Sequence, residues 1–245
     1  MAGLVPAICV FDICVMESGS TASQRAFFGR RKGHPLRPRQ AALFETLLPK
    51  LALDLTKPAP TDLRKLFGDV DDVRLEIGFG GAEHLIAEAT AHPRTGFIGS
   101  DGYLNAIGKA LVAVDDNKLA NIRLYLGDAS ALIDWLPDAA LARIDLLYPD
   151  PWPKRRHWKR RFIQNESLKR LARTLHAGGE LRFATDIPGY ASWTLARVLR
   201  SPDFAWTAET ADDWRKPWAG FAGTRYEAKA KREGRVPAYF IFRKK

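Results

Sequence analysis

The chain has 245 residues, which suits one α/β domain with short extensions and is enough to bury a substantial core. Hydrophobic residues make up 46% and charged residues 27%, the usual balance of a globular protein rather than of a disordered one. The net charge of +10 is unusual and favours an anionic partner, although charge alone does not identify it.

The N-terminus reads as an extension rather than a targeting signal. Residues 1–15 are apolar, but they lack a basic start and a small-residue cleavage site and are too short to span a bilayer. We expect Met16, which a polar stretch follows, to be the real initiator. Both cysteines, Cys9 and Cys14, precede it, so the remaining chain would have no disulfide. This favours a cytoplasmic protein, and the five histidines show no spacing that suggests a metal site.

A basic arm precedes the first predicted helix. Residues 25–39 are rich in arginine and lysine and are interrupted by glycine and proline, which is typical either of a nucleic-acid contact or of a solvated tail. Residues 39–55 then predict an amphipathic helix with leucines on one face. We therefore expect a flexible extension and arm at residues 1–36 and one folded domain over residues 37–245.

From Val73 onward, strand patterns alternate with helical ones. The predicted strands are 73–77, 95–99, 122–126, 142–148, 179–185, 204–207 and 238–242, and the predicted helices are those ending near 91 and at 104–114, 164–176 and 190–200. Strands separated by helices predict an α/β fold with a doubly wound, mostly parallel sheet. Counting the strands gives a seven-stranded sheet.

A glycine-rich turn and three acids predict a ligand site at the ends of these strands. Gly78 and Gly80 follow the first strand, where glycine allows a tight turn and a close approach to a ligand. Glu76 lies just before them. Asp101 ends the second strand, where a carboxylate can accept both hydroxyls of a ribose, and Asp128 follows the third, where it can accept from an adenine amino group.

Two cofactors fit glycines and a ribose acid in this pattern. The pyrophosphate of NAD favours bare helix-terminal amides without a carboxylate nearby. S-adenosylmethionine carries a sulfonium and an ammonium group, so four carboxylates (Glu76, Asp101, Asp128 and Asp150) suit it better. Helix capping explains any one of these acids, but less easily all four. We therefore predict S-adenosylmethionine as the cofactor.

Residues 149–161 carry the strongest functional signal. Three prolines stiffen a turn that presents Asp150 and Trp152 after the fourth strand, at the edge where open α/β sheets bind ligands. Trp152 either stacks on a base or plugs a gap between strand and helix. Six cations follow within eight residues and predict contacts to nucleic-acid phosphates: Lys154, Arg155, Arg156, Lys159, Arg160 and Arg161. His157 and Trp158 between them either stack on RNA or pack.

With this pocket in view, the chain resembles the bacterial tRNA (guanine-N7)-methyltransferases from Gly29 to its end. The resemblance rests on residues 75–80 (LEIGFG), the 149–161 run, 184–186 (ATD) and 224–227 (TRYE). The second and fourth motifs are specific to that family. The resemblance implies a Rossmann-like class I methyltransferase fold and methylation of guanosine 46 in the tRNA variable loop.

The resemblance also implies roles for individual residues. Cofactor contacts would come from Glu76, Gly78, Gly80, Asp101, Asp128 and Asp150, with Asp150 also catalytic. Substrate contacts would come from Lys154, Asp186, Thr224, Arg225, Tyr226 and Glu227, and further RNA contacts from Arg156, His157, Trp158, Lys159, Arg160 and Arg161. A tRNA is thus the expected partner, with no metal, no membrane and a monomeric enzyme.

Three positions depart from the family pattern, and three alternative functions stay open. Ala82 replaces a usual glycine, Asp101 a common glutamate and Trp158 a common histidine. A methyltransferase with another acceptor leaves both basic segments unexplained. A non-catalytic RNA-binding protein predicts a damaged pocket, and an NAD-dependent oxidoreductase predicts a less acidic one. Asp186 either contacts substrate or caps the following helix, and 224–227 is either a substrate segment or a surface loop.

Overall fold

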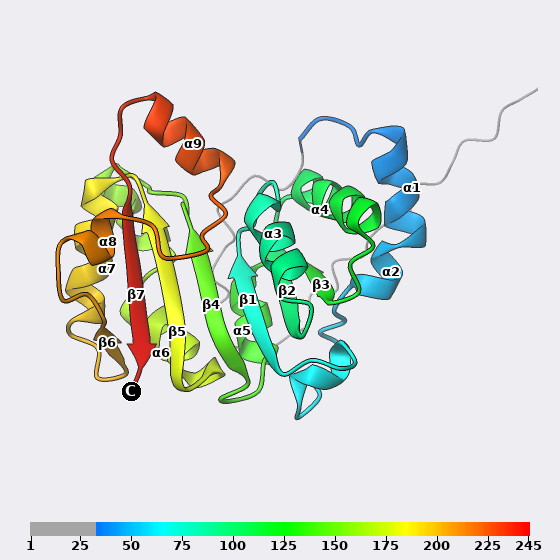
Figure 1. The fold of residues 1–245 in the computed structure, drawn as a ribbon, viewed down its shortest axis with the longest axis horizontal. Helices are drawn as coiled ribbons and strands as arrows, with labels where there is room; N and C mark the ends of the chain where they lie inside the picture. The colour runs from blue at the N-terminus through cyan, green and yellow to red at the C-terminus, as the bar shows by residue number, and fades with distance from the viewer. Residues whose placement is uncertain (1–32) are drawn as a thin grey trace, which may run out of the picture.

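A computed structural model describes residues 33–245 of the chain (Figure 1). The expected N-terminal extension, most of the basic arm and the proposed start at Met16 lie outside the described residues. The described part contains seven strands: β1 (Asp72–Ile77), β2 (Thr95–Asp101), β3 (Ile122–Leu126), β4 (Leu141–Leu147), β5 (Leu175–Thr185), β6 (Phe204–Trp206) and β7 (Ala238–Lys244).

The strands form one sheet in the order β3-β2-β1-β4-β5-β7-β6. The first five strands run parallel, and β7 pairs antiparallel with both β5 and β6. This confirms the predicted α/β fold with a seven-stranded, mostly parallel sheet. The chain leaves β1 toward β2 and β3 and later returns to place β4 on the other side of β1, so the strand order reverses between β1 and β4.

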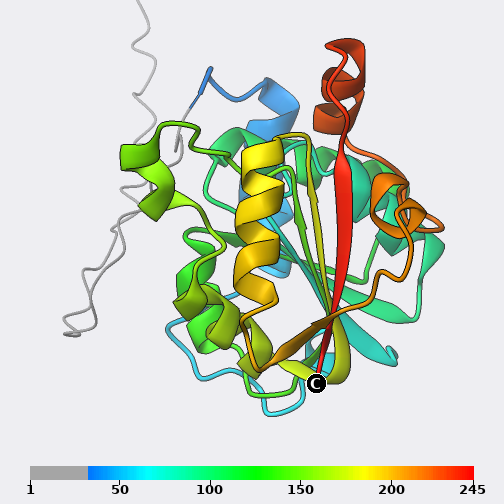
Figure 2. The ribbon, with the colours of Figure 1, turned by 90° about the vertical axis from the view of Figure 1, so that its left-hand side faces the viewer.

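Helices cover both faces of the sheet (Figure 2). One face packs its apolar residues against α5, α6 and α7, and the other packs against α1 to α4. The helices are α1 (Pro38–Thr46), α2 (Leu48–Leu51), η1 (Leu63–Leu66), α3 (Glu83–Ala91), α4 (Leu104–Asn117), α5 (Ala129–Trp135), η2 (Arg155–Arg160), α6 (Asn165–Thr174), α7 (Pro188–Val198), α8 (Asp212–Arg215) and α9 (Arg225–Arg232). No described helix is long and apolar enough to cross a membrane.

Two predicted helices end earlier than expected. The helix predicted over 39–55 is split into α1 and α2 and stops at Leu51. Pro49 lacks the N–H that a continuous helix needs there, which explains the break. Beyond α2, the backbone of Ala52 forms a parallel bridge with Leu124 of β3. Likewise α6 ends at Thr174, because Leu175 already pairs with Leu141 of β4.

Buried charges join α3 to the centre of the sheet. Arg143 on β4 donates to Asp145 at 2.8 Å and also pairs with Glu88 of α3. On β1, Glu76 pairs with His84 of α3 at 2.8 Å, where both side chains are buried. Burial opposes protonation of His84, but the Glu76 carboxylate outweighs it and raises the pKa of the imidazole. These pairs neutralise carboxylates that the strand interior would otherwise bury at high cost.

Removing one buried cation from this network should destabilise the fold. Arg143→Met leaves Glu88 and Asp145 without their main partner, so we expect the free energy of unfolding to fall by about 3–5 kcal/mol. Urea denaturation followed by circular dichroism measures it. Arg94→Met, which removes an exposed arginine paired with Asp71, is the matched control and should barely move the midpoint. Equal losses in both variants would contradict a structural role for the network.

Candidate active site

A cavity of about 850 Å³ opens at the carboxyl ends of β1 to β4, where the strand order reverses. This is the position at which open α/β sheets bind their ligands, and its volume lies in the usual range for small-molecule sites. Its lining includes Gly78, Gly80, Asp101, Tyr103, Asp128, Ser130, Tyr148, Asp150, Trp152, Lys159, Arg160 and Tyr226.

Asp101 holds together the two loops on the β1–β2 side of the cavity. Its Oδ2 accepts the N–H of Gly80 at 2.9 Å and its Oδ1 the N–H of Tyr103 at 2.8 Å. Gly78 and Gly80 have φ angles of 72° and 57°, the left-handed region in which glycine carries no steric cost. A carboxylate has about four acceptor sites, so Asp101 retains two for a ligand.

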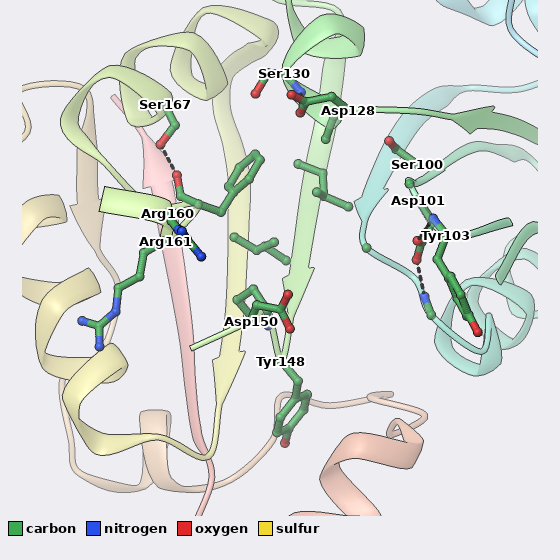
Figure 3. Close-up of a pocket in the computed structure, with 18 of the residues that line it drawn as sticks. Ser100, Asp101, Tyr103, Asp128, Ser130, Tyr148, Asp150, Arg160, Arg161 and Ser167 are labelled. Atoms are coloured by element: carbon green, nitrogen blue, oxygen red, sulfur yellow. Dashed lines mark hydrogen bonds between the residues drawn. The ribbon is translucent and has the colours of Figure 1, made fainter. Parts of the chain in front are cut away.

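Three carboxylates surround the cavity in Figure 3, as the strand ends predicted. Burial raises the pKa of Asp101, to which the nearby Asp150 charge adds, while the two backbone hydrogen bonds oppose the shift. Loss of hydration also raises the pKa of Asp150. Neither Asp101 nor Asp150 forms a salt bridge within the described residues. A positively charged ligand would therefore stabilise both in their ionised form.

One carboxylate oxygen of Asp128 caps a helix, and the other faces no donor within the described residues. It is the N-cap of α5, and its Oδ1 accepts the N–H of Ser130 at 2.9 Å. Helix capping thus accounts for this acid, as the alternative interpretation held. Since the capping bond uses Oδ1, Oδ2 remains available to a donor in the cavity.

The structure does not place Glu76 with these acids. Its side chain is 4% exposed, is absent from the cavity lining and is engaged by His84. Residues alternate sides along a strand, and Glu76 points toward α3 while its neighbour Ile77 lines the cavity. A direct cofactor contact from Glu76 is therefore not supported by this geometry, which favours a role in seating α3.

The turn after β4 is conformationally strained. Tyr148 and Trp152 have φ angles of 50° and 43°, a region that non-glycine residues rarely adopt. The guanidinium of Arg160 lies 4.9 Å from the centre of the Trp152 ring. Arg161 donates to the backbone oxygens of Pro151 and Gly189 at 2.8 and 3.1 Å, which ties this turn to α7.

The basic run divides into exposed and buried cations. Lys154, Arg155, Arg156 and Lys159 are exposed on or just before η2, and Lys159 and Arg160 line the cavity. Arg161 also borders the cavity but is only 3% exposed, which favours a supporting role, and an RNA contact from it stays a prediction. Its partners are the carbonyl groups described above and the surrounding aromatic rings.

The two aromatic residues within η2 differ in their surroundings. Trp158 packs edge-on against Trp193, with ring centres 5.4 Å apart, which favours the packing interpretation. His157 lies edge-on to Trp152 at 5.9 Å. Partial burial and the surrounding cations lower the pKa of His157.

The 224–227 segment caps and begins α9, and so is more than a surface loop. The hydroxyl of Thr224 accepts the N–H of Glu227 at 3.1 Å. Glu227 is buried and accepts from the hydroxyl of Tyr239 at 2.5 Å. Only Tyr226 of this segment lines the cavity, and a methyl group on Gly80 would lie 3.2 Å from its ring.

The other predicted substrate residues lie in ion pairs beside the cavity. Arg225 pairs with Glu83 of α3 at 2.9 Å, and Asp186 pairs with Arg235 at 2.5 Å. Asp186, Glu227 and Arg225 thus hold α9 and its flanking loops in place. Whether any of them also contacts substrate remains a prediction.

Sequence reasoning missed two tyrosines of the cavity wall. Tyr103 follows Asp101 at the start of α4, and Tyr148 ends the predicted fourth strand, directly before the acidic turn. The position of both tyrosines at a strand end is the sequence signal that could have identified them. No sequence pattern indicates the positive φ of Tyr148, because that angle follows from how the turn packs. No group of acidic residues, histidines or cysteines within residues 33–245 is arranged to hold a metal ion.

Comparison with known proteins gives consistent matches. Residues 71–239 match the profile of a family described as "Putative methyltransferase". The chain is 59% identical over 222 residues to a tRNA (guanine-N(7)-)-methyltransferase of Rhodopseudomonas palustris strain BisB5, covering 90% of this chain and 87% of that one. It is 56% identical over 229 residues to a protein of the same name from Nitrobacter hamburgensis, covering 93% and 88%.

Solved structures show the same fold at low sequence identity. The aminoglycoside resistance methyltransferase NpmB1 aligns with a TM-score of 0.51 and 17% identity over 77% of this chain and 95% of its own. The 16S rRNA methyltransferase KamB aligns with a TM-score of 0.53 and 14% identity over 77% and 94%. These likenesses support the Rossmann-like methyltransferase fold.

The two backbone hydrogen bonds of Asp101 should stabilise the loops that contain Gly80 and Tyr103. Asp101→Ala removes two charge-assisted hydrogen bonds, each contributing about 1.5–3 kcal/mol, so the amides of Gly80 and Tyr103 should lose protection from hydrogen exchange by about 10- to 100-fold. Exchange measured by NMR on the ligand-free protein tests this. Asp128→Ala is the control, and it should affect only the start of α5. Unchanged protection at both amides in Asp101→Ala would contradict the bridging role.

Proposed function

The chain belongs to the tRNA (guanine-N(7)-)-methyltransferase family, and we propose that it methylates N7 of a guanosine in tRNA with S-adenosylmethionine as donor. One observation carries the proposal beyond the family name. Carboxylates without cationic partners face a cavity whose rim continues directly into exposed cations on η2. The acidic interior suits a cationic cofactor, and the basic rim suits RNA.

The cavity residues fit S-adenosylmethionine, which when bound supplies an electrophilic methyl group on a positively charged sulfur. Asp101 has acceptor sites left for ribose hydroxyls, and Asp128 has a free oxygen for an adenine amino group. Asp150 faces the same cavity from the opposite loop and adds a negative charge. These assignments are proposals for individual residues, which the family name alone does not specify.

The start of α3 argues against a dinucleotide such as NAD. A pyrophosphate would need free amides at this helix terminus. Glu83 occupies the first turn of α3, beside Gly81, and its charge is held there by Arg225. A pyrophosphate would have to compete with the Glu83 carboxylate for this helix terminus, whereas a cationic cofactor would not.

Methylation of guanine N7 requires alignment of the reacting atoms and stabilisation of positive charge, and it requires no proton removal. Guanine N7 has a free lone pair and no proton, so it can form the new N–C bond without a general base. The purine becomes positively charged as this bond forms. We assign Asp150 to stabilise that charge, either through space or by accepting from the guanine edge, and the stiff turn to hold it in place.

The basic side of the cavity would hold the RNA. Trp152 lies on the cavity wall, and we assign it to contact the target base, where stacking contributes about 1–3 kcal/mol per base. Lys154, Arg156 and Lys159 are exposed beside it and would bind backbone phosphates. Lys159 and Arg160 lie where the bound base and its phosphate would enter the cavity.

We further propose guanosine 46 of the variable loop as the target, since the motif resemblance points to this position. A monomeric enzyme is part of the same proposal. A tRNA substrate supports action in the cytoplasm.

Methyl transfer to an unmodified tRNA transcript tests the function. With purified protein and labelled S-adenosylmethionine, we expect incorporation at one guanosine, located by borohydride reduction and aniline cleavage at the variable loop. A matched transcript with 7-deazaguanosine at that position lacks the acceptor nitrogen and should not be methylated. Methylation of the deaza transcript, or none of either RNA, would overturn the proposal. Cleavage at another guanosine would overturn only the choice of position 46.

Replacing the proposed catalytic carboxylate should separate turnover from binding. Asp150→Asn keeps the size of the side chain but removes its charge, so we expect kcat to fall on the order of 100-fold while tRNA affinity changes less than about twofold. In the wild type, activity should fall as pH decreases through the raised pKa of Asp101 and Asp150, hence at higher pH than for ordinary aspartates. The pH profile of kcat/KM between pH 4.5 and 8 measures this.

The contradicting outcomes of that experiment are distinct. Equal losses of turnover and tRNA affinity in Asp150→Asn would assign the residue to binding. A wild-type profile that stays flat to the lowest pH would show that neither aspartate must be ionised.

A further inference from the structure

We propose that α9, together with Lys109 and Arg37, forms a second phosphate-binding track, so that the RNA is held on two sides of the cavity. This inference rests on the proposed function, because it takes the RNA as the ligand of both tracks. The first track is the basic segment at η2 described above. The second track lies across the cavity from it. Neither the motif resemblance nor the charge runs of the sequence indicated a role for Lys109, Lys229 or Arg232.

The cations of α9 lie along one face of the helix. Arg225, Lys229 and Arg232 are separated by four and three residues, the spacing that aligns side chains on one side of an α-helix. We call these three residues the α9 stripe, and it extends about 10 Å along the axis. A row of cations at this spacing suits successive phosphates of an RNA strand.

The way α9 is anchored turns the stripe outward. Glu227 and Ala230 are the buried residues of the helix, and Glu227 is fixed by its bond to Tyr239. Tyr226, adjacent to the stripe, lines the cavity. A strand bound along the stripe would therefore pass the cavity mouth with its bases near Tyr226.

Lys109 and Arg37 continue the stripe toward α1. Partial burial lowers the pKa of Lys109, and the charges of Arg225 and Arg37 lower it further, while the carboxylate of Glu83 opposes them. Lys109 thus lies within electrostatic range of both arginines. Lys109 and Arg37 also line a shallow groove of about 430 Å³ between α1 and α4. Like charges gathered on a surface cost free energy unless an anion binds them, so the arrangement favours a polyanionic ligand.

Most of these cations lack a close carboxylate. Within the described residues, no salt bridge involves Arg37, Lys109 or Arg232, and Lys229 comes only within 3.9 Å of Glu233. Arg225 differs, because Glu83 pairs with it at 2.9 Å. The neighbouring Arg39 is also neutralised, by Asp115 and Asp116. Four cations thus remain available for phosphates.

The two tracks border the same end of the sheet from different sides. Figure 2 shows η2, in green, projecting on one side of the sheet, and α9, in red, above the start of β7. The basic arm reaches this end too, because Gly33 donates to Asn105 at 3.1 Å and Asn105 donates to His34 at 2.8 Å. Asn105 is two residues from Tyr103 of the cavity wall.

A charge-neutral triple variant tests the second track. Lys109→Gln/Lys229→Gln/Arg232→Gln should weaken tRNA binding on the order of tenfold at moderate salt. The slope of log K against log salt concentration should shrink by about 0.7–0.9 for each phosphate that the variant no longer neutralises. The control Lys50→Gln/Lys57→Gln/Lys65→Gln removes three exposed lysines from α2, η1 and the loop between them, and should change neither quantity. Fluorescence anisotropy with unmodified tRNA measures both.

Two further measurements keep the outcomes distinct. S-adenosylmethionine affinity and the melting temperature should stay at wild-type values in the test variant, which would exclude misfolding as the cause. Equal tRNA affinity and salt slope in the test variant and the wild type would overturn the second track, even if the wild type methylates tRNA. Equal losses in test and control variants would overturn it as well, because a net-charge effect would then suffice. Failure of the wild type to methylate tRNA would instead overturn the proposed function.

Discussion

The desolvation of carboxylates at the centre of the sheet is the constraint on which the rest of this structure depends. Burying an ionised carboxylate is costly unless a cation or hydrogen-bond donors compensate it. Asp145, Glu88 and Glu76 receive that compensation from Arg143 and His84 within the protein. Asp101 and Asp150 receive no protein cation, and their raised pKa values record the cost.

This division separates architecture from function within a few residues. The compensated carboxylates lock α3 onto β1 and β4, and thereby set the position from which the glycine loop leaves the sheet. The uncompensated ones face the cavity and make a cationic ligand favourable there. A fully neutralised cavity would be more stable without ligand, but it would have less affinity for a sulfonium.

Charge is sorted at a larger scale as well. Acidic residues are gathered inside the cavity, and basic residues around its mouth, on η2 and on α9. Strained backbone at Tyr148 and Trp152 holds the acidic turn between the two. Because strain of this kind persists only where surrounding contacts enforce it, Arg161 is better understood as a support of the turn than as an RNA contact.

The sequence alone determined the parallel sheet, the edge at which ligands bind and the acids that end its strands. Hydrophobic periodicity and glycine placement are local properties, and the carboxyl ends of parallel strands must share one edge. Only the tertiary structure decided which charged side chains have partners inside the protein: Glu76 pairs with His84, Glu227 with Tyr239, and Arg161 with backbone carbonyls. It also brought Lys109 within electrostatic range of Arg225, more than 100 positions away. Partners of this kind are set by packing between distant elements, and charge pairing depends on distance in space, which no local pattern encodes.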